Sequence, residues 1–221
     1  TGENIVQVLS GDGVTMTNLA TPPADWSAAN QPTFGFIHEG RLWGGGNQND
    51  PNRLYYTDLT SHEDFTGGVS GTVAVYPGEN EAIIRAIPFK SLIIVFKKPR
   101  GIYLVDTSDP TVANWKVKRL NGALGLAGAQ AVQVVDLGGD DMLFLDTAGN
   151  LQALSGVTEL GLGSRNLSQI ANMSNFIDNV VNRARLFDAR SIYYAAKREL
   201  HFALSDTSST TNDFRLVIDF N

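Results

Sequence analysis

The sequence contains no cysteine, which excludes disulfide bridges and thiolate metal sites. It contains no run of about 20 consecutive apolar residues, so we expect no membrane span. It begins with Thr1 and Gly2, which resemble neither an initiator methionine nor a signal peptide. It stops at Asn221 directly after a strand-like pattern. These features suggest an excised or processed fragment.

Sequence motifs of catalysis and nucleotide binding are also missing. There is no Gly-x-Ser-x-Gly elbow, and no Lys-Ser/Thr pair follows the glycines at 44–46. The glycines at 161 and 163 lack the rest of a dinucleotide fingerprint. We therefore expect no catalytic residue and no cofactor, and we predict that the chain is not an enzyme.

Metal ligands do not cluster in the sequence either. The three histidines, His38, His62 and His201, are far apart in the chain and share no metal-ligand spacing. The aspartates within 136–146 lack the spacing of a calcium loop, and their glycine neighbours are typical of hairpin turns. We predict no metal site and structural roles for these residues.

The residues that are present favour a packed β protein. Hydrophobic residues make up 43% of the 221 residues and charged residues only 18%, so the chain can bury a core. Most of its 22 glycines separate short apolar runs. Many short strands joined by tight turns give this distribution.

Charge is acidic overall and unevenly distributed. The 17 basic and 23 acidic residues give a net charge of −6, which disfavours general nucleic-acid binding. Residues 1–81 hold two basic and ten acidic groups, giving −8, while 82–221 hold 15 and 13, giving +2. Two readings stay open: one acidic and one mildly basic face, or an ordinary solvated surface with uneven charge.

Strand patterns repeat along the chain. A leading hairpin is predicted over 4–9 and 14–19, and the prolines within 21–26 indicate a connection. Four similar units of three or four strands then follow. The predicted strands of these units cover 34–38, 41–45, 53–57 and 62–65; 82–87, 91–96, 102–105 and 115–120; 131–136, 142–145 and 151–154; and 190–195, 200–204 and 214–220.

The units start near residues 34, 82, 131 and 190, about 50 residues apart, which is the period of propeller blades. A sandwich or barrel would also give short strands, but not this long repeat. We therefore predict an all-β fold: a partial or fragmentary β-propeller of about four to five antiparallel meander blades. Residues 1–221 would form one propeller domain or fragment, with leading strands and a linker over 1–30.

One stretch departs from the β pattern. Between residues 167 and 184, apolar residues recur at steps of three and four, which predicts an inserted α-helix near 167–185. Ser164 or Asn166 is a candidate N-cap. The helix would pack either on its own domain or on a neighbouring subunit.

Two basic clusters are candidate contact sites for a partner or for DNA. The first, Lys97, Lys98 and Arg100, falls on a predicted turn. In the second, Lys116 and Lys118 alternate with Trp115 and Val117 on a predicted strand, so the lysines share one face. Solubility or protection of a sheet edge is the alternative role for both clusters.

Several segments together resemble a known family, and they occur in the order 40–45, 51–58, 63–65, 93–98, 101–103, 125 and 143–149. Over roughly residues 26–220 the chain resembles the β-propeller tail-hub, nozzle or packaged-DNA-stabilisation proteins of tailed bacteriophages. The resemblance implies a propeller of about six blades in a homo-oligomeric ring below the portal. This chain shows only four to five units.

The resemblance also implies a function. Such a ring continues the channel through which double-stranded DNA passes without sequence-specific binding, and it attaches portal or adaptor subunits and tail fibres. It implies a virion location, with assembly in the cytoplasm of the bacterial host, and no catalytic residues. Two alternatives stay open: a generic propeller scaffold, and a carbohydrate-binding or glycan-active propeller. The latter requires Trp26, Trp43 or Trp115 to be exposed as a sugar platform.

Overall fold

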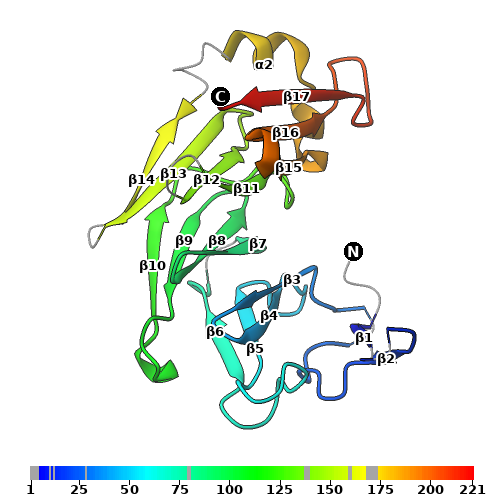
Figure 1. Cartoon of the computed structure of the whole chain (residues 1–221), viewed down its shortest axis with the longest axis vertical. Coiled ribbons are helices and arrows are strands. Elements are labelled where there is room, and N and C mark those ends of the chain that lie inside the picture. The colour runs from blue at the N-terminus through cyan, green and yellow to red at the C-terminus, as the bar shows by residue number, and fades with distance from the viewer. Residues whose placement is uncertain are drawn as a thin grey trace. The chain divides into compact units, whose positions relative to one another are not determined.

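The computed structural model describes residues 5–9, 11, 13–27, 29–78, 81–136, 140–158, 161–167 and 174–221 (Figure 1). A leading hairpin pairs β1 (Gln7–Leu9) with β2 (Met16–Asn18). Sheet 1 contains β3 (Phe34–His38), β4 (Arg41–Gly45), β5 (Arg53–Tyr56) and β6 (Gly71–Ala74). Sheet 2 contains β7 (Ala82–Phe89), β8 (Leu92–Lys98), β9 (Ile102–Asp106) and β10 (Lys116–Asn121). Sheet 3 contains β11 (Val132–Asp136), β12 (Asp140–Leu145), β13 (Leu151–Thr158) and β14 (Gly161–Asn166). Sheet 4 contains β15 (Arg190–Tyr194), β16 (Glu199–Leu204) and β17 (Phe214–Asp219).

Strands that follow one another in the chain lie next to each other in every sheet. The pairs with a resolved register are antiparallel, so each sheet is an up-and-down meander. The prediction of an all-β chain built from consecutive blade-like meanders is confirmed. The four sheets begin at Phe34, Ala82, Val132 and Arg190, within one residue of the predicted starts.

The last strand of sheet 1 was placed wrongly by the sequence. Residues 62–65 were predicted to close the first unit, but β6 does so instead. Asp64 bridges to Thr21, and its Oδ1 accepts hydrogen bonds from the backbone amides of Thr66 and Gly67. Because this carboxylate organises a turn, the segment around it does not continue as a strand of sheet 1.

The helix is shorter than predicted over its described part. Helix α2 (Ser174–Val180) lies within the predicted range 167–185, and residues 168–173 lie outside the described residues. A separate 3₁₀-helical stretch, Arg183–Asp188, begins after Asn182, whose side chain accepts a hydrogen bond from the amide of Ala184. The proposed caps are wrong, because Ser164 and Asn166 are paired residues of β14.

Helix α2 packs on elements of its own unit. Ile177 is buried, and its Cγ2 would lie 2.9 Å from a Cβ added at Gly149, in the turn between β12 and β13. The ring of Phe176 meets Phe214 edge-on at 6.2 Å. These contacts agree with the prediction of core packing and leave subunit contact by other residues untested.

The chain divides into two compact units. Unit 1 comprises Thr1–Lys97 and Tyr103–Lys118, and unit 2 comprises Lys98–Ile102 and Arg119–Asn221. The expectation of one propeller domain over 1–221 stays a prediction.

Sheets 1 and 2 share the main core of unit 1. Its buried apolar residues are Phe34, Trp43, Leu54, Tyr56, Val75, Ile83, Ala86, Ile93, Val95, Tyr103 and Val105. The first strands of the two sheets, β3 and β7, contact each other. Neighbouring propeller blades pack in the same way, face against face with their inner strands together.

The opposite face of sheet 1 is covered by the N-terminal segment. Trp26 packs against Tyr55 of β5 and Phe65, with ring centroids 5.4 and 4.8 Å apart. A Cβ at Gly44 would lie 3.0 Å from Cη2 of Trp26, so this close approach favours glycine. The segment predicted as leading strands and a linker therefore also forms a second small core.

In unit 2, as in unit 1, the first strands of two consecutive sheets contact each other. β11 and β15 contact each other, and Gln133 Nε2 donates to the carbonyl of Ser191 at 2.8 Å. Tyr193 donates its hydroxyl to the carbonyl of Asp136 at 3.2 Å. Leu143 and Phe144 of sheet 3, and Leu200 and Phe202 of sheet 4, are buried. Two successive blade-like sheets thus lie together in each unit.

Candidate functional site

The structure separates the residues of the first basic cluster. Lys97 has no exposed surface and lies in β8 rather than in a turn. Its Nζ donates to the carbonyl of Tyr76 at 3.1 Å and lies 4.8 Å from the ring centroid of Tyr103. Lys97 therefore presents no ammonium surface for the predicted contact. Lys98 and Arg100 are exposed, and a role for them in DNA or partner contact stays a prediction.

The second basic cluster lies on the surface of unit 1. Lys116 and Lys118 are exposed on β10, the border strand of sheet 2, while Trp115 and Val117 pack against the core. Lysines on a border strand also hinder pairing with foreign strands. The alternation that the sequence predicts is present, and it leaves both lysine side chains accessible.

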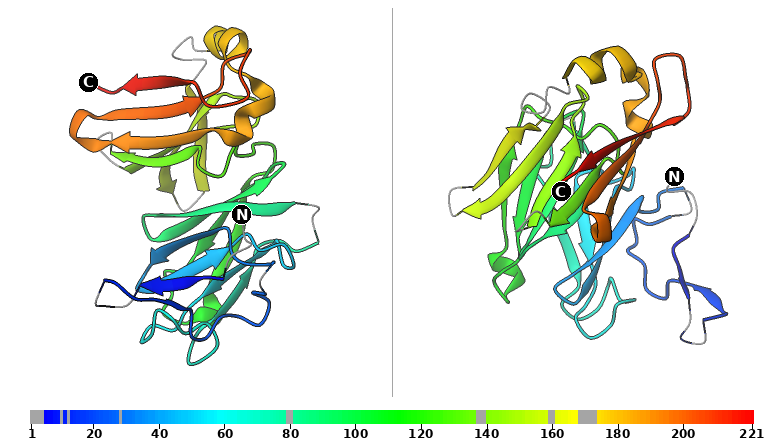
Figure 2. Two further views of the ribbon diagram at one scale, coloured as in Figure 1. Left: turned by 90° about the vertical axis from the view of Figure 1, so that its right-hand side faces the viewer. Right: turned by 45° about the horizontal axis from the view of Figure 1, so that its top comes forward.

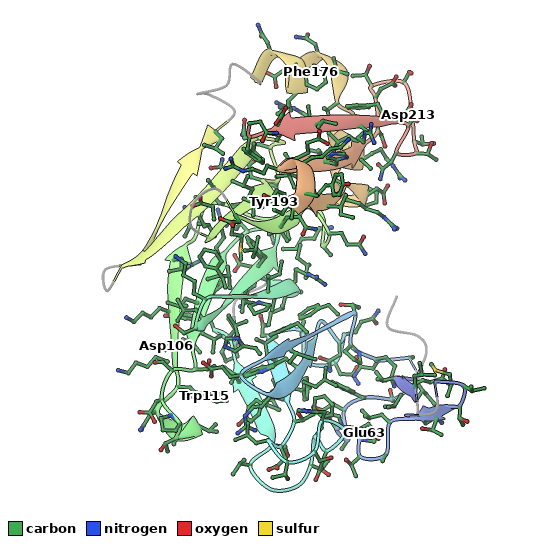
Figure 3. All side chains as sticks on the ribbon, viewed as in Figure 1. Glu63, Asp106, Trp115, Phe176, Tyr193 and Asp213 are labelled. Carbon is green, nitrogen blue, oxygen red and sulfur yellow. The ribbon has the colours of Figure 1, made fainter. Side chains whose placement is uncertain are left out.

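A polar cleft of about 490 Å³ adjoins this strand in unit 1. It is lined by Asp106, Ser108, Asp109, Ala113, Asn114, Trp115 and Lys116, and Figure 3 labels Asp106 and Trp115. The 3₁₀-helical turn Val112–Asn114 forms part of its wall. Tryptophan beside carboxylates and a lysine offers both an apolar surface and charged groups to a partner.

Hydrogen bonds favour the ionised form of the carboxylates in this cleft. Asp106 accepts from the hydroxyl of Ser108 at 2.7 Å and from its amide at 3.1 Å. These bonds, with smaller contributions from Lys116 and Lys118, hold the pKa of Asp106 below its usual value. The pKa of Asp109 is lowered chiefly by the amide of Thr111 and by Asn114. The two lysines thus face two carboxylates, and this balance weakens attraction for phosphate.

Behind the cleft, Trp115 is fixed by a buried aromatic cluster. Its ring lies 5.5 Å from Trp43 and 5.0 Å from Tyr56, and its Nε1 donates to the carbonyl of Asp109 at 2.8 Å. The guanidinium of Arg41 lies over the rings of Tyr56 and Trp115 at 5.2 and 5.8 Å. A rigidly held Trp115 gives the cleft a defined wall.

Two of the three tryptophans are too deeply buried to act as sugar platforms. Trp43 is 1% exposed and Trp26 is 6% exposed, so both rings belong to cores. Trp115 is half-buried. Of the three candidate sugar platforms, Trp115 is therefore the one whose ring is partly accessible.

The histidines occupy three separate environments. His38 is buried, its Nε2 lies 2.8 Å from Oγ1 of Thr107, and burial lowers its pKa. His201 lies 2.8 Å from Oε2 of Glu199, and His62 is exposed. Within the described ranges, no three His, Cys, Asp or Glu side chains are grouped so that they could hold a metal ion.

A second polar cleft, in unit 2, was not predicted. It has a volume of about 390 Å³ and is lined chiefly by Gln130, Arg185, Phe187, Asp188, Arg190 and Asn212. Arg185 pairs with Asp188 at 2.5 Å and lies over the ring of Phe187 at 4.7 Å. The only signal in the sequence was the density of arginines between 183 and 190, but loops distant in sequence complete the cleft.

Comparisons with known proteins do not assign this chain to a family. No family model matches the chain, and neither does any curated protein. Among solved structures, it is similar to the crystal structure of the N-terminal domain of Nup159, with a TM-score of 0.48 and 10% identity. The likeness covers 85% of this chain and 44% of that chain, and it is too weak to assign a function.

Over the part of the chain that is described, no helix is long and apolar enough to cross a membrane.

Proposed function

We propose that this chain is a structural, non-enzymatic component of a bacteriophage tail, in the hub, nozzle or adaptor region below the portal. The observation that carries the proposal is the order of the resembling segments together with their place in the sheets. Segment 40–45 covers a turn and β4, and segment 143–149 covers the end of β12 and the turn after it. Their largest side chains, Trp43 and Phe144, are buried between strands.

The proposed role rests on blade-like sheets and on charge. Within unit 1, packed sheets hold loops that offer contact surfaces, of which the cleft beside β10 is one. A channel for DNA should attract its phosphates only weakly, and the −8 balance of residues 1–81 agrees with an acidic or neutral lining. The partners would be portal or adaptor subunits, other tail proteins and further copies in a ring.

The virus particle provides the test of this proposal. Mass spectrometry of purified particles from the source of the gene should detect peptides of this chain at a constant ratio to the major capsid protein. Antibodies raised against the recombinant chain should label the region where tail and capsid join. Absence from purified particles, or specific binding of glycans by the isolated chain, would refute the proposal and favour its alternatives.

A further inference from the structure

The cleft of unit 2 is held together by hydrogen bonds between segments that are distant in sequence. The backbone amide of Ser191 donates to the carbonyl of Gln130 at 2.8 Å, and the side-chain amide of Asn212 donates to the carbonyl of Asp188 at 2.8 Å. In Figure 2 the strands of sheet 4 are orange and red, and the 3₁₀-helical stretch that ends at Asp188 leads into β15. These bonds hold the walls of the cleft in place without a ligand, as in most binding pockets.

The same 3₁₀-helical stretch packs closely against the loop before β11. A Cβ added at Gly128 would lie 2.6 Å from the carbonyl oxygen of Phe187, so this close approach favours glycine. Leu186 is buried, whereas Phe187 is 51% exposed and lines the cleft. An exposed aromatic ring in a polar cleft offers apolar surface to a ligand.

The charges that line the cleft leave one cation without a counter-ion. Two arginines and one aspartate line it, and Arg185 pairs with Asp188 at 2.5 Å. Arg190 is exposed, and its guanidinium forms no ion pair with the described residues. The lining therefore has one positive charge in excess, which favours an anionic ligand.

This balance selects a carboxylate over a phosphate group. The planar guanidinium of Arg190 can bind a carboxylate through two parallel N–H···O bonds. A phosphate dianion would instead bring a second negative charge close to Asp188, whose one counter-ion in the cleft is Arg185. The exposed ring of Phe187 adds a surface for an apolar group beside the carboxylate. An acidic side chain next to an apolar one has both features.

We propose that the cleft of unit 2 binds an acidic peptide segment of a partner protein. In this complex Arg190 holds the carboxylate of a glutamate or aspartate, and Phe187 contacts the apolar neighbour of that residue. The exposed side chain of Gln130 is a further donor on the wall of the cleft. A volume of about 390 Å³ is in the range of ligand pockets and holds a few side chains. This inference does not depend on the proposed tail function.

Nuclear magnetic resonance of the ¹⁵N-labelled chain tests the proposal. The probe is the peptide acetyl-Leu-Glu-Leu-amide, and acetyl-Leu-Gln-Leu-amide is its uncharged counterpart. The glutamate peptide should shift the backbone amide signals of Gln130, Arg190 and Asn212 in a saturable manner at millimolar concentrations. The glutamine peptide should bind about tenfold more weakly, because it lacks the charge-assisted hydrogen bonds. Equal binding of the two peptides, or no saturable shift with the glutamate peptide, would overturn the proposal.

Variants of the chain locate the contact. Arg190→Gln should weaken binding of the glutamate peptide about tenfold. Arg190→Lys should recover part of this loss, because it keeps the charge without the bidentate geometry. Arg215→Gln removes the same charge from an exposed arginine outside the cleft and is the matched control. Circular dichroism verifies that the variants are folded, and unchanged affinity in a folded Arg190→Gln variant would contradict the proposal.

A third peptide distinguishes carboxylate from phosphate as the bound group. In acetyl-Leu-phosphoserine-Leu-amide a dianion takes the place of the glutamate side chain. It should bind more weakly than the glutamate peptide, because it is repelled by Asp188. Tighter binding of the phosphoserine peptide would refute the carboxylate assignment and identify a phosphate site in its place.

Discussion

Arg41 shows how one side chain joins several parts of unit 1. It is buried, and its Nη1 donates to the carbonyls of Thr57 and Val69 at 2.5 and 3.2 Å. Nearby, Asp58 accepts hydrogen bonds from Thr60 and from the amide of Val69, which lower its pKa to about 2, with a smaller contribution from Arg41. The guanidinium thus satisfies loop carbonyls while stacking on aromatic rings, so the loop after β5 depends on it.

Replacing Arg41 should therefore destabilise the fold. We expect Arg41→Ala to lower the free energy of unfolding by roughly 2–3 kcal/mol, since one buried and one partly buried carbonyl lose this donor and two rings lose their cation. Arg41→Lys should recover only part of this, because an ammonium cannot reproduce the planar stacking. Urea unfolding measures both effects. Arg53→Ala, at a partly exposed ion pair with Asp50, is the control and should change stability by less than about 1 kcal/mol.

Among the elements, β8 and the leading hairpin are at opposite extremes of burial. Leu92 through Lys97 of β8 are all buried, and the strand lies between β7 and β9. β2 is exposed along its whole length, and among the strands that the structure describes it pairs with β1 alone. An inner strand can exchange its amide hydrogens only when the sheet opens, whereas a short exposed hairpin opens at little cost in free energy.

Hydrogen exchange should reveal this difference. We expect the amides of β8 and β9 to be the slowest in unit 1 and those of β1 and β2 to exchange orders of magnitude faster. Mass spectrometry of peptides after timed exchange in deuterated buffer measures the rates. The described amides of β12, an inner strand of sheet 3, serve as the reference for slow exchange in unit 2. Equal protection of the hairpin and β8 would show that the hairpin is stabilised by contacts beyond those described.

At the scale of the whole molecule, charge would set the strength of any encounter with DNA. The net charge is −6, Lys97 is buried, and Lys116 and Lys118 are beside carboxylates. The candidate lysines therefore supply little net positive charge to displace counterions from a duplex. This agrees with a protein past which DNA can slide.

Duplex binding should accordingly be weak and salt-sensitive. We expect no retardation of a duplex in gels at physiological salt, and weak retardation at low salt that the variant K116Q/K118Q reduces further. Fluorescence anisotropy of a labelled duplex gives the salt dependence. The double variant K90Q/K197Q removes the same two positive charges at exposed lysines outside both clusters and is the matched control. Tight binding at physiological salt that persists in K116Q/K118Q would exclude the predicted contact.

The sequence by itself determined the elements that alternate strongly. Apolar and polar residues repeat with period two through much of β3, β16 and β17, so these strands follow from local patterns. The sequence did not predict strands β6 and β14, because their residues are polar or glycine-rich and hardly alternate between apolar and polar. Their strands form because a neighbouring strand supplies hydrogen-bond partners, which is information from elsewhere in the chain.

Only the tertiary structure decided which charged and aromatic residues are accessible. Lys97 and Lys98 are adjacent in sequence, yet one is buried and the other exposed, since both faces of β8 are covered as far as Lys97 and Lys98 is the last residue of the strand. Likewise, Trp26 and Trp43 became core residues through contacts with strands distant in sequence. Burial depends on which faces meet when sheets pack, and local patterning alone does not contain that choice.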